Sequence, residues 1–137
     1  MKETKSREER IAELLSPSAD DIIAAIVAFL PQVFSADYQT IHRAFATFKQ
    51  KKEYQDILQD FEFVGTSPYP YSPLLERVLS RLQEDRLLSA RNPDYQVYLT
   101  SDTSRTAIQQ RIITKFSELQ KRKLKKLAEE LEKVLVE

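Results

Sequence analysis

The segment 72–100, SPLLERVLSRLQEDRLLSARNPDYQVYLT, constrains the fold more than any other part of the chain. It opens with Ser72-Pro73, a helix-capping residue followed by a proline at the first helical position, where a missing N–H costs nothing. Apolar residues then recur at helical spacing to about Arg86, which predicts an amphipathic helix. The segments 87–91 and 95–100 read as two strands, and the Asn-Pro-Asp sequence between them has turn chemistry. We therefore predict an amphipathic helix that runs directly into a β-hairpin.

Three helices are predicted before this segment. The residues 19–30 are apolar almost all round, so their helix should lie at the centre of the core, and Pro31 ends it. A clean apolar stripe indicates a second helix over 38–48, and a short third helix should cover 54–61, followed by a short strand over 61–64. We expect three core residues from three different elements: Phe45, Leu79 and Val97.

The segment 104–136 contains neither proline nor glycine, which predicts one long helix. The last apolar residues of this segment are spaced three, four and three apart, as in a coiled coil. A lone helix of this length cannot cover such a stripe, so it should pair with a second copy or fold back on residues 1–16. We favour a homodimer. Its predicted interface residues are Ile108, Ile112, Phe116, Leu119, Leu124, Leu127, Leu131 and Val134.

The charge balance argues against a general attraction to polyanions. The chain has 21 basic and 21 acidic side chains and so no net charge, although a local basic face remains compatible with that balance. The longest apolar run, 22–30, is far shorter than the roughly 20 residues of a membrane span. The charged first ten residues are not followed by a signal-peptide pattern. We expect a cytoplasmic protein that does not enter membranes.

The sequence contains no constellation typical of an enzyme. His42 is the only histidine and cysteine is absent, whereas acid–base catalysis and zinc binding both need several convergent groups. Phosphate-cradling loops need several glycines, and Gly65 is the only one. We therefore expect no enzymatic activity, no metal and no cofactor. Four tyrosines could line a small-molecule pocket, but packing of the proline-rich loop on the hairpin is their expected role: Tyr69, Tyr71, Tyr95 and Tyr98.

Over about residues 20–100 the chain resembles winged helix-turn-helix proteins. Three stretches carry this resemblance: Phe61-Glu62-Phe63, Pro70-Tyr71-Ser72-Pro73-Leu74-Leu75 and the run from Leu79 to Leu88. They are similar to sequences in bacterial antitoxin-related and phage-associated winged-helix proteins. This chain has no glycine in its Tyr69-Pro70-Tyr71-Ser72 turn, where that group has one.

The resemblance implies a mostly α (α+β) fold: a winged helix-turn-helix with a small β-hairpin wing and a long C-terminal helix. The chain would then consist of a charged N-terminal segment over 1–16, a winged-helix domain over 17–101 and a dimerisation helix over 102–137. In that fold the helix over 73–86 is the recognition helix, and the turn after Arg91 is the wing.

Two groups of residues are candidates for contact with double-stranded DNA. The recognition helix and the wing could reach base edges and phosphates, and a dense basic cluster near the C-terminus could grip phosphates. The predicted contacts are Arg77, Ser80, Arg81, Arg91, Asn92, Lys121, Arg122, Lys123, Lys125 and Lys126. The structural alternative is that both groups are solvated surfaces. In that case Arg77 and Arg81 pair with Glu84 and Asp85, and the cluster is balanced by Glu129, Glu130 and Glu132.

Two functions from different classes follow. The first is a winged-helix DNA-binding protein, a transcriptional regulator or a related regulatory component. The second is a non-enzymatic protein–protein interaction module of the same fold, dimeric through its C-terminal helix. The balanced charge favours the interaction module, whereas the arginines of the recognition helix and the wing permit the regulator.

Overall fold

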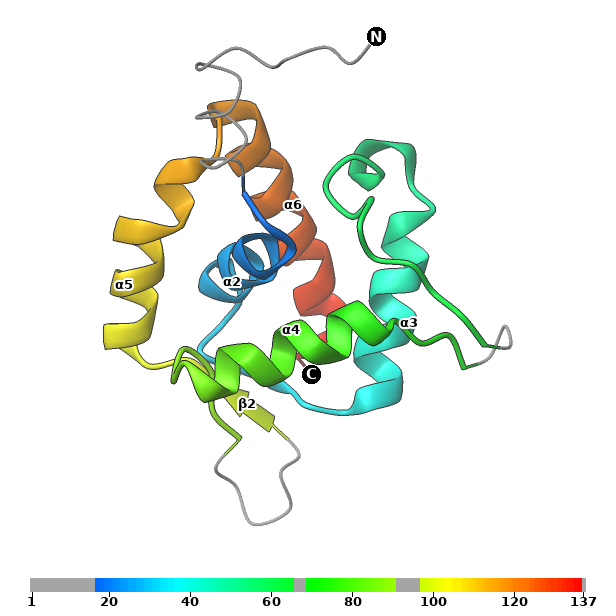
Figure 1. Cartoon of the computed structure of the whole chain (residues 1–137), viewed down its shortest axis with the longest axis horizontal. Helices are drawn as coiled ribbons and strands as arrows, with labels where there is room; N and C mark the ends of the chain where they lie inside the picture. Colours follow the sequence, from blue (N-terminus) through cyan, green and yellow to red (C-terminus); the bar gives the residue numbers. More distant parts are fainter. Residues whose placement is uncertain (1–16, 66–68, 91–96, 137) are drawn as a thin grey trace, which may run out of the picture.

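The structure is a computed structural model that describes residues 17–65, 69–90 and 97–136. These residues form a mostly helical, α+β arrangement with one small antiparallel sheet, as the sequence predicts (Figure 1). In chain order the elements are α2 (Ala19–Phe29), β1 (Val33–Ser35), α3 (Tyr38–Lys49), the 3-10 turn η1 (Lys52–Tyr54), α4 (Pro73–Glu84), β2 (Val97–Leu99), α5 (Asp102–Arg111), the 3-10 turn η2 (Ile113–Lys115) and α6 (Glu118–Leu135).

Helix α2 lies at the centre of the molecule, as its apolar composition predicts. Ser18 caps it with a reciprocal pair of bonds: Asp21 N–H donates to the serine Oγ, and Ser18 N–H donates to the aspartate. Ile23 and Ile26 are each 1% exposed. The helices α4, α5 and α6 pack around α2 (Figure 1). Burial on several sides explains why no polar stripe interrupts this helix.

Strand β2 has a neighbour on each side: β1 on one side, and the single residue Ser89, from the segment after α4, on the other. Strand β1 pairs antiparallel with β2, with Val33 opposite Leu99 and Phe34 opposite Tyr98. On its other side Leu99 forms an isolated bridge with Ser89. The sequence pattern did not predict β1, because three residues are too few to display an alternation. The turn predicted at Asn92-Pro93-Asp94 lies outside the described residues.

The prediction that Val97 belongs to the core is wrong. Phe34 and Tyr98 face the core, with ring centroids 5.6 Å apart, and Thr100 is fully buried. Leu99 is 37% exposed and Val97 is only half-buried, so the side chains of Val97 and Leu99 lie on the outer face of the sheet. Phe45 and Leu79 are buried as predicted.

The connection between α3 and α4 contains less regular structure than its apolar pattern suggests. The predicted helix over 54–61 is replaced by η1 and a series of turns, although its four apolar residues are all buried: Tyr54, Ile57, Leu58 and Phe61. The predicted strand over 61–64 is reduced to one bridge between Val64 and Tyr71. Gly65 follows with φ of 96°, and a Cβ there would lie 2.8 Å from the Tyr69 carbonyl oxygen. Only glycine fits this turn without strain.

The prediction of one long helix over 104–136 is wrong. Helix α5 ends at Arg111, and Phe116 has an extended backbone with φ −95° and ψ 146°. Ser117 then caps α6, and Ser117 and Gln120 satisfy each other's backbone N–H groups. This Ser-x-x-Gln capping box is a helix start signal in the sequence. The break allows α6 to pack against α2 and α3.

The C-terminal helices complete the core of the chain itself. Five of the eight predicted dimer-interface residues are buried within one copy: Ile108, Phe116, Leu124, Leu127 and Leu131. Ile112 is partly buried against the same cluster, whereas Leu119 and Val134 are 62% and 44% exposed. The five buried residues therefore cannot form the predicted coiled-coil interface with a second copy, and that part of the prediction is wrong. One cluster of buried residues includes side chains from both sides of residue 101. Residues 1–16 lie outside the described part.

Helix α4 ends in a Schellman motif with an arginine at the position that usually holds glycine. Leu87 N–H donates to the Leu82 carbonyl at 2.9 Å, and Arg86 N–H donates to the Gln83 carbonyl at 3.1 Å. Arg86 has φ of 62°, in the left-handed region. A residue with a Cβ is strained there, and glycine is not.

We expect Arg86→Gly to raise the free energy of unfolding by up to about 1 kcal/mol, because relief of left-handed strain exceeds the extra entropy of the unfolded chain. Urea unfolding measures this change. Arg122→Gly is the matched control, since Arg122 lies exposed within α6 and glycine there should cost about 1 kcal/mol. A destabilised Arg86→Gly variant would contradict the strain at this cap.

Candidate nucleic-acid interface

The N-terminus of α4 is fixed by local caps and by a bond from α3. Ser72 Oγ accepts the Leu75 N–H at 3.2 Å, and Pro73 occupies the first helical turn, as predicted. The backbone N–H of Ser72 donates to Nδ1 of His42 at 3.0 Å. Because Ser72 and His42 are both buried, this bond anchors α4 to α3 inside the protein.

The only histidine of the chain therefore has a structural role. His42 is 1% exposed and its ring stacks on Tyr38 at a centroid distance of 4.2 Å, with Tyr71 at 5.5 Å. Burial lowers the pKa of the imidazole, while the negative charge of Glu76 opposes that shift. Since Nδ1 accepts a hydrogen bond, the neutral ring carries its proton on Nε2. Sequence reasoning did not predict this anchor, because it joins positions 30 residues apart.

The outer face of α4 carries both charge signs. Its buried face consists of Leu75, Val78, Leu79 and Leu82. The exposed side chains on the other side are Glu76, Arg77, Ser80, Gln83 and Glu84. Among them are the predicted contacts Arg77 and Ser80. Glu76 accepts a hydrogen bond from the Tyr71 hydroxyl at 2.9 Å, which raises the pKa of that tyrosine. Arg77 forms no ion pair with any residue that the structure describes.

Arg81 is bound at the side of α4 rather than exposed on its outer face. Its Nε and Nη2 atoms each donate to a different oxygen of Asp20 at 2.7 Å. This bidentate pair joins α4 to the first turn of α2 and raises the pKa of the guanidinium. The predicted alternative partners of Arg81, Glu84 and Asp85, are not the ones it uses. The pair is invisible to local reasoning because 61 residues separate its members.

The basic cluster of α6 is largely neutralised within the chain. Lys121 pairs with Glu118 at 3.2 Å. Lys123 pairs with Asp56 at 3.0 Å, and Lys126 with Glu53 at 2.8 Å, so the cluster bridges α6 to the turn after α3. These three lysines do not pair with Glu129, Glu130 or Glu132, the acidic residues expected to balance the cluster. Glu130 instead accepts the Tyr54 hydroxyl at 2.6 Å. Arg122 and Lys125 are exposed and form no ion pair with a described residue.

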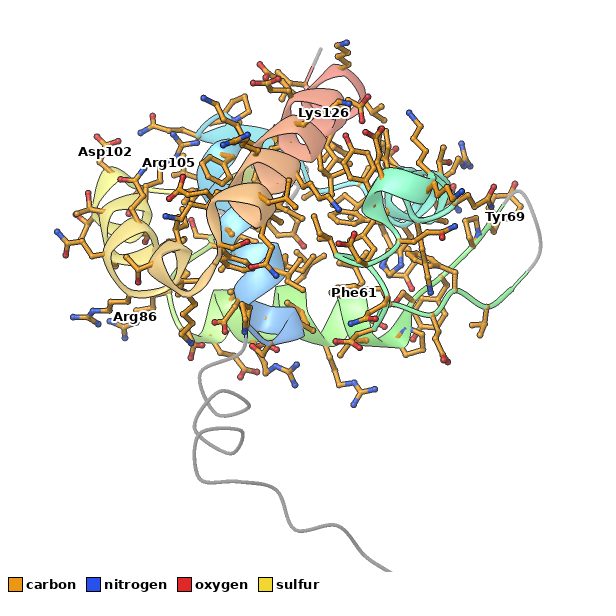
Figure 2. The ribbon with its side chains drawn as sticks, turned by 90° about the horizontal axis from the view of Figure 1, so that it is seen from above. Phe61, Tyr69, Arg86, Asp102, Arg105 and Lys126 are labelled. Atoms are coloured by element: carbon orange, nitrogen blue, oxygen red, sulfur yellow. The ribbon has the colours of Figure 1, made fainter. Side chains whose placement is uncertain are left out.

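The two groups of candidate residues lie on different sides of the molecule. In Figure 2, α4 runs along one edge, and Lys126 of α6 lies near the opposite edge. The central helix α2 packs against both α4 and α6. A straight duplex docked on the outer face of α4 would therefore not meet the basic cluster. The remaining predicted contacts, Arg91 and Asn92, lie outside the described residues.

Comparison with protein-family models, curated proteins and solved structures finds no match for this chain. Within residues 17–65, 69–90 and 97–136, no helix has both the length and the apolar character needed to cross a bilayer. The same residues contain no group of three or more histidine, aspartate or glutamate side chains placed to hold a metal ion.

Proposed function

We propose that the protein is a winged helix-turn-helix module that binds duplex DNA, with α4 as its recognition helix. The order of elements supports this reading: α2, β1 and α3 precede α4, and the chain then returns through Ser89 and β2 beside β1. This order agrees with the one expected of a winged helix, in which a helical core precedes the recognition helix and the chain then returns beside the first strand. In helix-turn-helix proteins the second helix of the motif enters the major groove.

The observation that carries the proposal is the state of Arg77. It is exposed on the outer face of α4 and forms no ion pair with a described residue, whereas Arg81 is held by Asp20. Arginine reads guanine through a bidentate contact with O6 and N7, and Ser80, nearly one turn further, can donate to a base or a phosphate. The anchors of α4 at Ser72 and Arg81 fix its orientation, so these side chains are presented from a rigid support.

The charges on the outer face of α4 predict that non-specific binding to DNA is weak relative to specific binding. Glu76 and Glu84 are exposed on the same helix as Arg77 and repel phosphates, and the basic cluster of α6 lies on another side of the molecule. Non-specific affinity depends on the number of neutralised phosphates. We therefore expect weak binding to random duplex, a shallow salt dependence and a strong reliance on base contacts by Arg77.

Arg77→Ala should weaken binding to the preferred sequence by about 1–3 kcal/mol and relax the preference at one base pair. The preferred sequence is first obtained by selection from a random duplex library with the full chain. Fluorescence anisotropy at low salt then gives the affinities. Arg122→Ala is the matched control, because it removes the same charge from the far side of the molecule and should leave the affinity unchanged.

Two results would reject DNA binding by α4. One is a selection that enriches no sequence and shows no duplex binding at low salt. The other is an equal loss of affinity in Arg77→Ala and Arg122→Ala, which would indicate general attraction rather than readout by α4.

The second candidate is a protein–protein interaction module, and the charge pattern is what favours it. The exposed face of α4 mixes one arginine with Glu76 and Glu84, and three lysines of α6 already have acidic partners. Protein interfaces accept such mixed charge, whereas phosphate backbones select against it. Failure of the duplex selection, together with an unchanged fold, would leave this candidate in place.

A further inference from the structure

Strand β1 exposes a row of backbone hydrogen-bonding groups at the edge of the sheet. Thr100 N–H donates to the Gln32 carbonyl at 2.8 Å, which makes this pair a hydrogen-bonded pair of the ladder. Bonded and non-bonded pairs alternate in an antiparallel ladder, so Phe34 and Tyr98 form the next bonded pair. The N–H and C=O groups of Val33 and Ser35 therefore point away from β2. An open edge of this kind is a template for another strand.

Apolar side chains gather around the same edge. Val33 is 46% exposed, and Leu99, its neighbour across the ladder, is 37% exposed on the same face of the sheet. Val134 of α6 is 44% exposed. A groove of about 380 Å³ runs along β1 and is lined by Thr40, Val97 and the residues 134–136 at the end of α6. Its lining holds no charged side chain, in a chain that is 31% charged.

We propose that this edge binds β1 of a second copy of the chain, antiparallel and about a two-fold axis. In that register Val33 of one copy lies opposite Ser35 of the other, and each of these pairs exchanges both backbone hydrogen bonds. Phe34 lies at the axis. The two small sheets then become one continuous sheet, and Val33 and Val134 of both copies are brought toward the interface. Such an isologous contact uses the same patch twice and closes on itself.

The charge of the surface favours a second copy over other occupants. Two identical surfaces can meet only if they do not repel each other, and an uncharged patch meets this condition. The chain before Pro17 is a poor occupant because the part of it that could reach the edge is highly charged. Helix α2 has 11 residues and so separates Pro17 from β1 by about 16 Å, or about five extended residues. Only residues 1–12 could therefore reach the edge, and seven of those are charged.

The proposed dimer does not depend on DNA binding. The lining of the groove includes no residue of α4, so Arg77 and Ser80 stay free when β1 is paired. A failure of the dimer proposal would leave the function of α4 untouched, and the reverse also holds.

Sedimentation velocity over a concentration series of the intact protein tests the proposal. We expect a dimer for the intact protein and a monomer for Val33→Lys, which places a charge at the axis-flanking pair. Ser35→Pro should also be monomeric, because it removes one outward N–H without touching a bond to β2. The control is Leu119→Lys, an equally drastic change at an exposed residue of α6. It should remain dimeric.

Backbone amide exchange provides a second readout on the same samples. The Val33 and Ser35 amides should exchange slowly in the dimer and fast in Val33→Lys, while the Phe34 amide stays protected in both. A monomeric intact protein at every concentration would overturn the proposal. So would a dimer that survives Val33→Lys and is lost in Leu119→Lys, because that pattern would place the interface on α6. If Ser35→Pro does not fold, Val33→Lys decides alone.

Discussion

Leu127→Ala should lower the free energy of unfolding by about 2–5 kcal/mol, the usual cost of a large-to-small change in a packed core. Leu127 is fully buried in the cluster that α6 forms with α2 and α3. Urea unfolding of the intact chain measures the loss. Leu119→Ala on the same helix is the matched control, because Leu119 is 62% exposed and the change should stay within about 0.5 kcal/mol.

The measurement is best made in the Val33→Lys background. A dimer through β1 would add a concentration-dependent contribution to the stability of the intact protein, and this variant removes it. A loss below about 1 kcal/mol for Leu127→Ala would mean that α6 does not belong to the core. The coiled-coil interpretation of the C-terminal segment would then return.

Local signals in the sequence account for the parts of the fold that were predicted well. Ser72-Pro73 starts α4 where the capping rules place it, and Pro31 ends α2. The helical spacing of apolar residues identifies the buried face of α4, and therefore also the exposure of Arg77 and Ser80. Each of these features depends on residues within one or two turns of one another, which is the range over which sequence pattern is informative.

Features that depend on distant residues were missed. The partner of Arg81 is Asp20, and the partner of the Ser72 N–H is His42, both far away along the chain. The edge strand β1 takes its conformation from pairing with β2, since three residues alone do not specify a strand. Tertiary structure likewise decides which acidic residue pairs with a given lysine. Two lysines of α6, for example, pair with acidic residues of the turn after α3.

The break between α5 and α6 belongs to a third category, because its signal was present in the sequence. Ser117 and Gln120 have the spacing of a capping box, and serine is a weak helix former in the interior. The absence of proline and glycine outweighed that signal in predicting a continuous helix. The break changes the role of the apolar stripe: a continuous helix would present it to a second copy, whereas the chain folds back and buries most of it.

Acidification from about pH 7.5 to about pH 5 should destabilise the protein through His42, the only side chain whose unperturbed pKa falls in that window. Burial holds the pKa of His42 in the folded protein below the value of about 6.5 expected for the unfolded chain. Above that value both states hold a neutral imidazole, so the anchor to Ser72 is fully effective. As the pH falls further, the unfolded chain takes up a proton that the folded chain resists, and the free energy of unfolding decreases.

The decrease should level off once the pH passes the folded pKa of His42, where the folded state is protonated as well. Carboxylates act in a different window. The pKa of Asp37 is lowered chiefly by its hydrogen bonds with Thr40, and its contribution is lost only as the pH falls below about 4. A urea-unfolding series that stays above about pH 5 therefore isolates the histidine.

His42→Leu separates the two consequences of this buried ring. It leaves the Ser72 N–H buried without an acceptor, which should cost about 1–3 kcal/mol at neutral pH. It also removes the titrating group, so its stability should hardly change across the window in which the intact protein weakens. Tyr38→Leu is the control, because it removes the stacked ring but keeps the imidazole, and its pH dependence should persist. A His42→Leu profile as steep as that of the intact protein would place the titration elsewhere, because a leucine cannot bind the proton that the linkage requires.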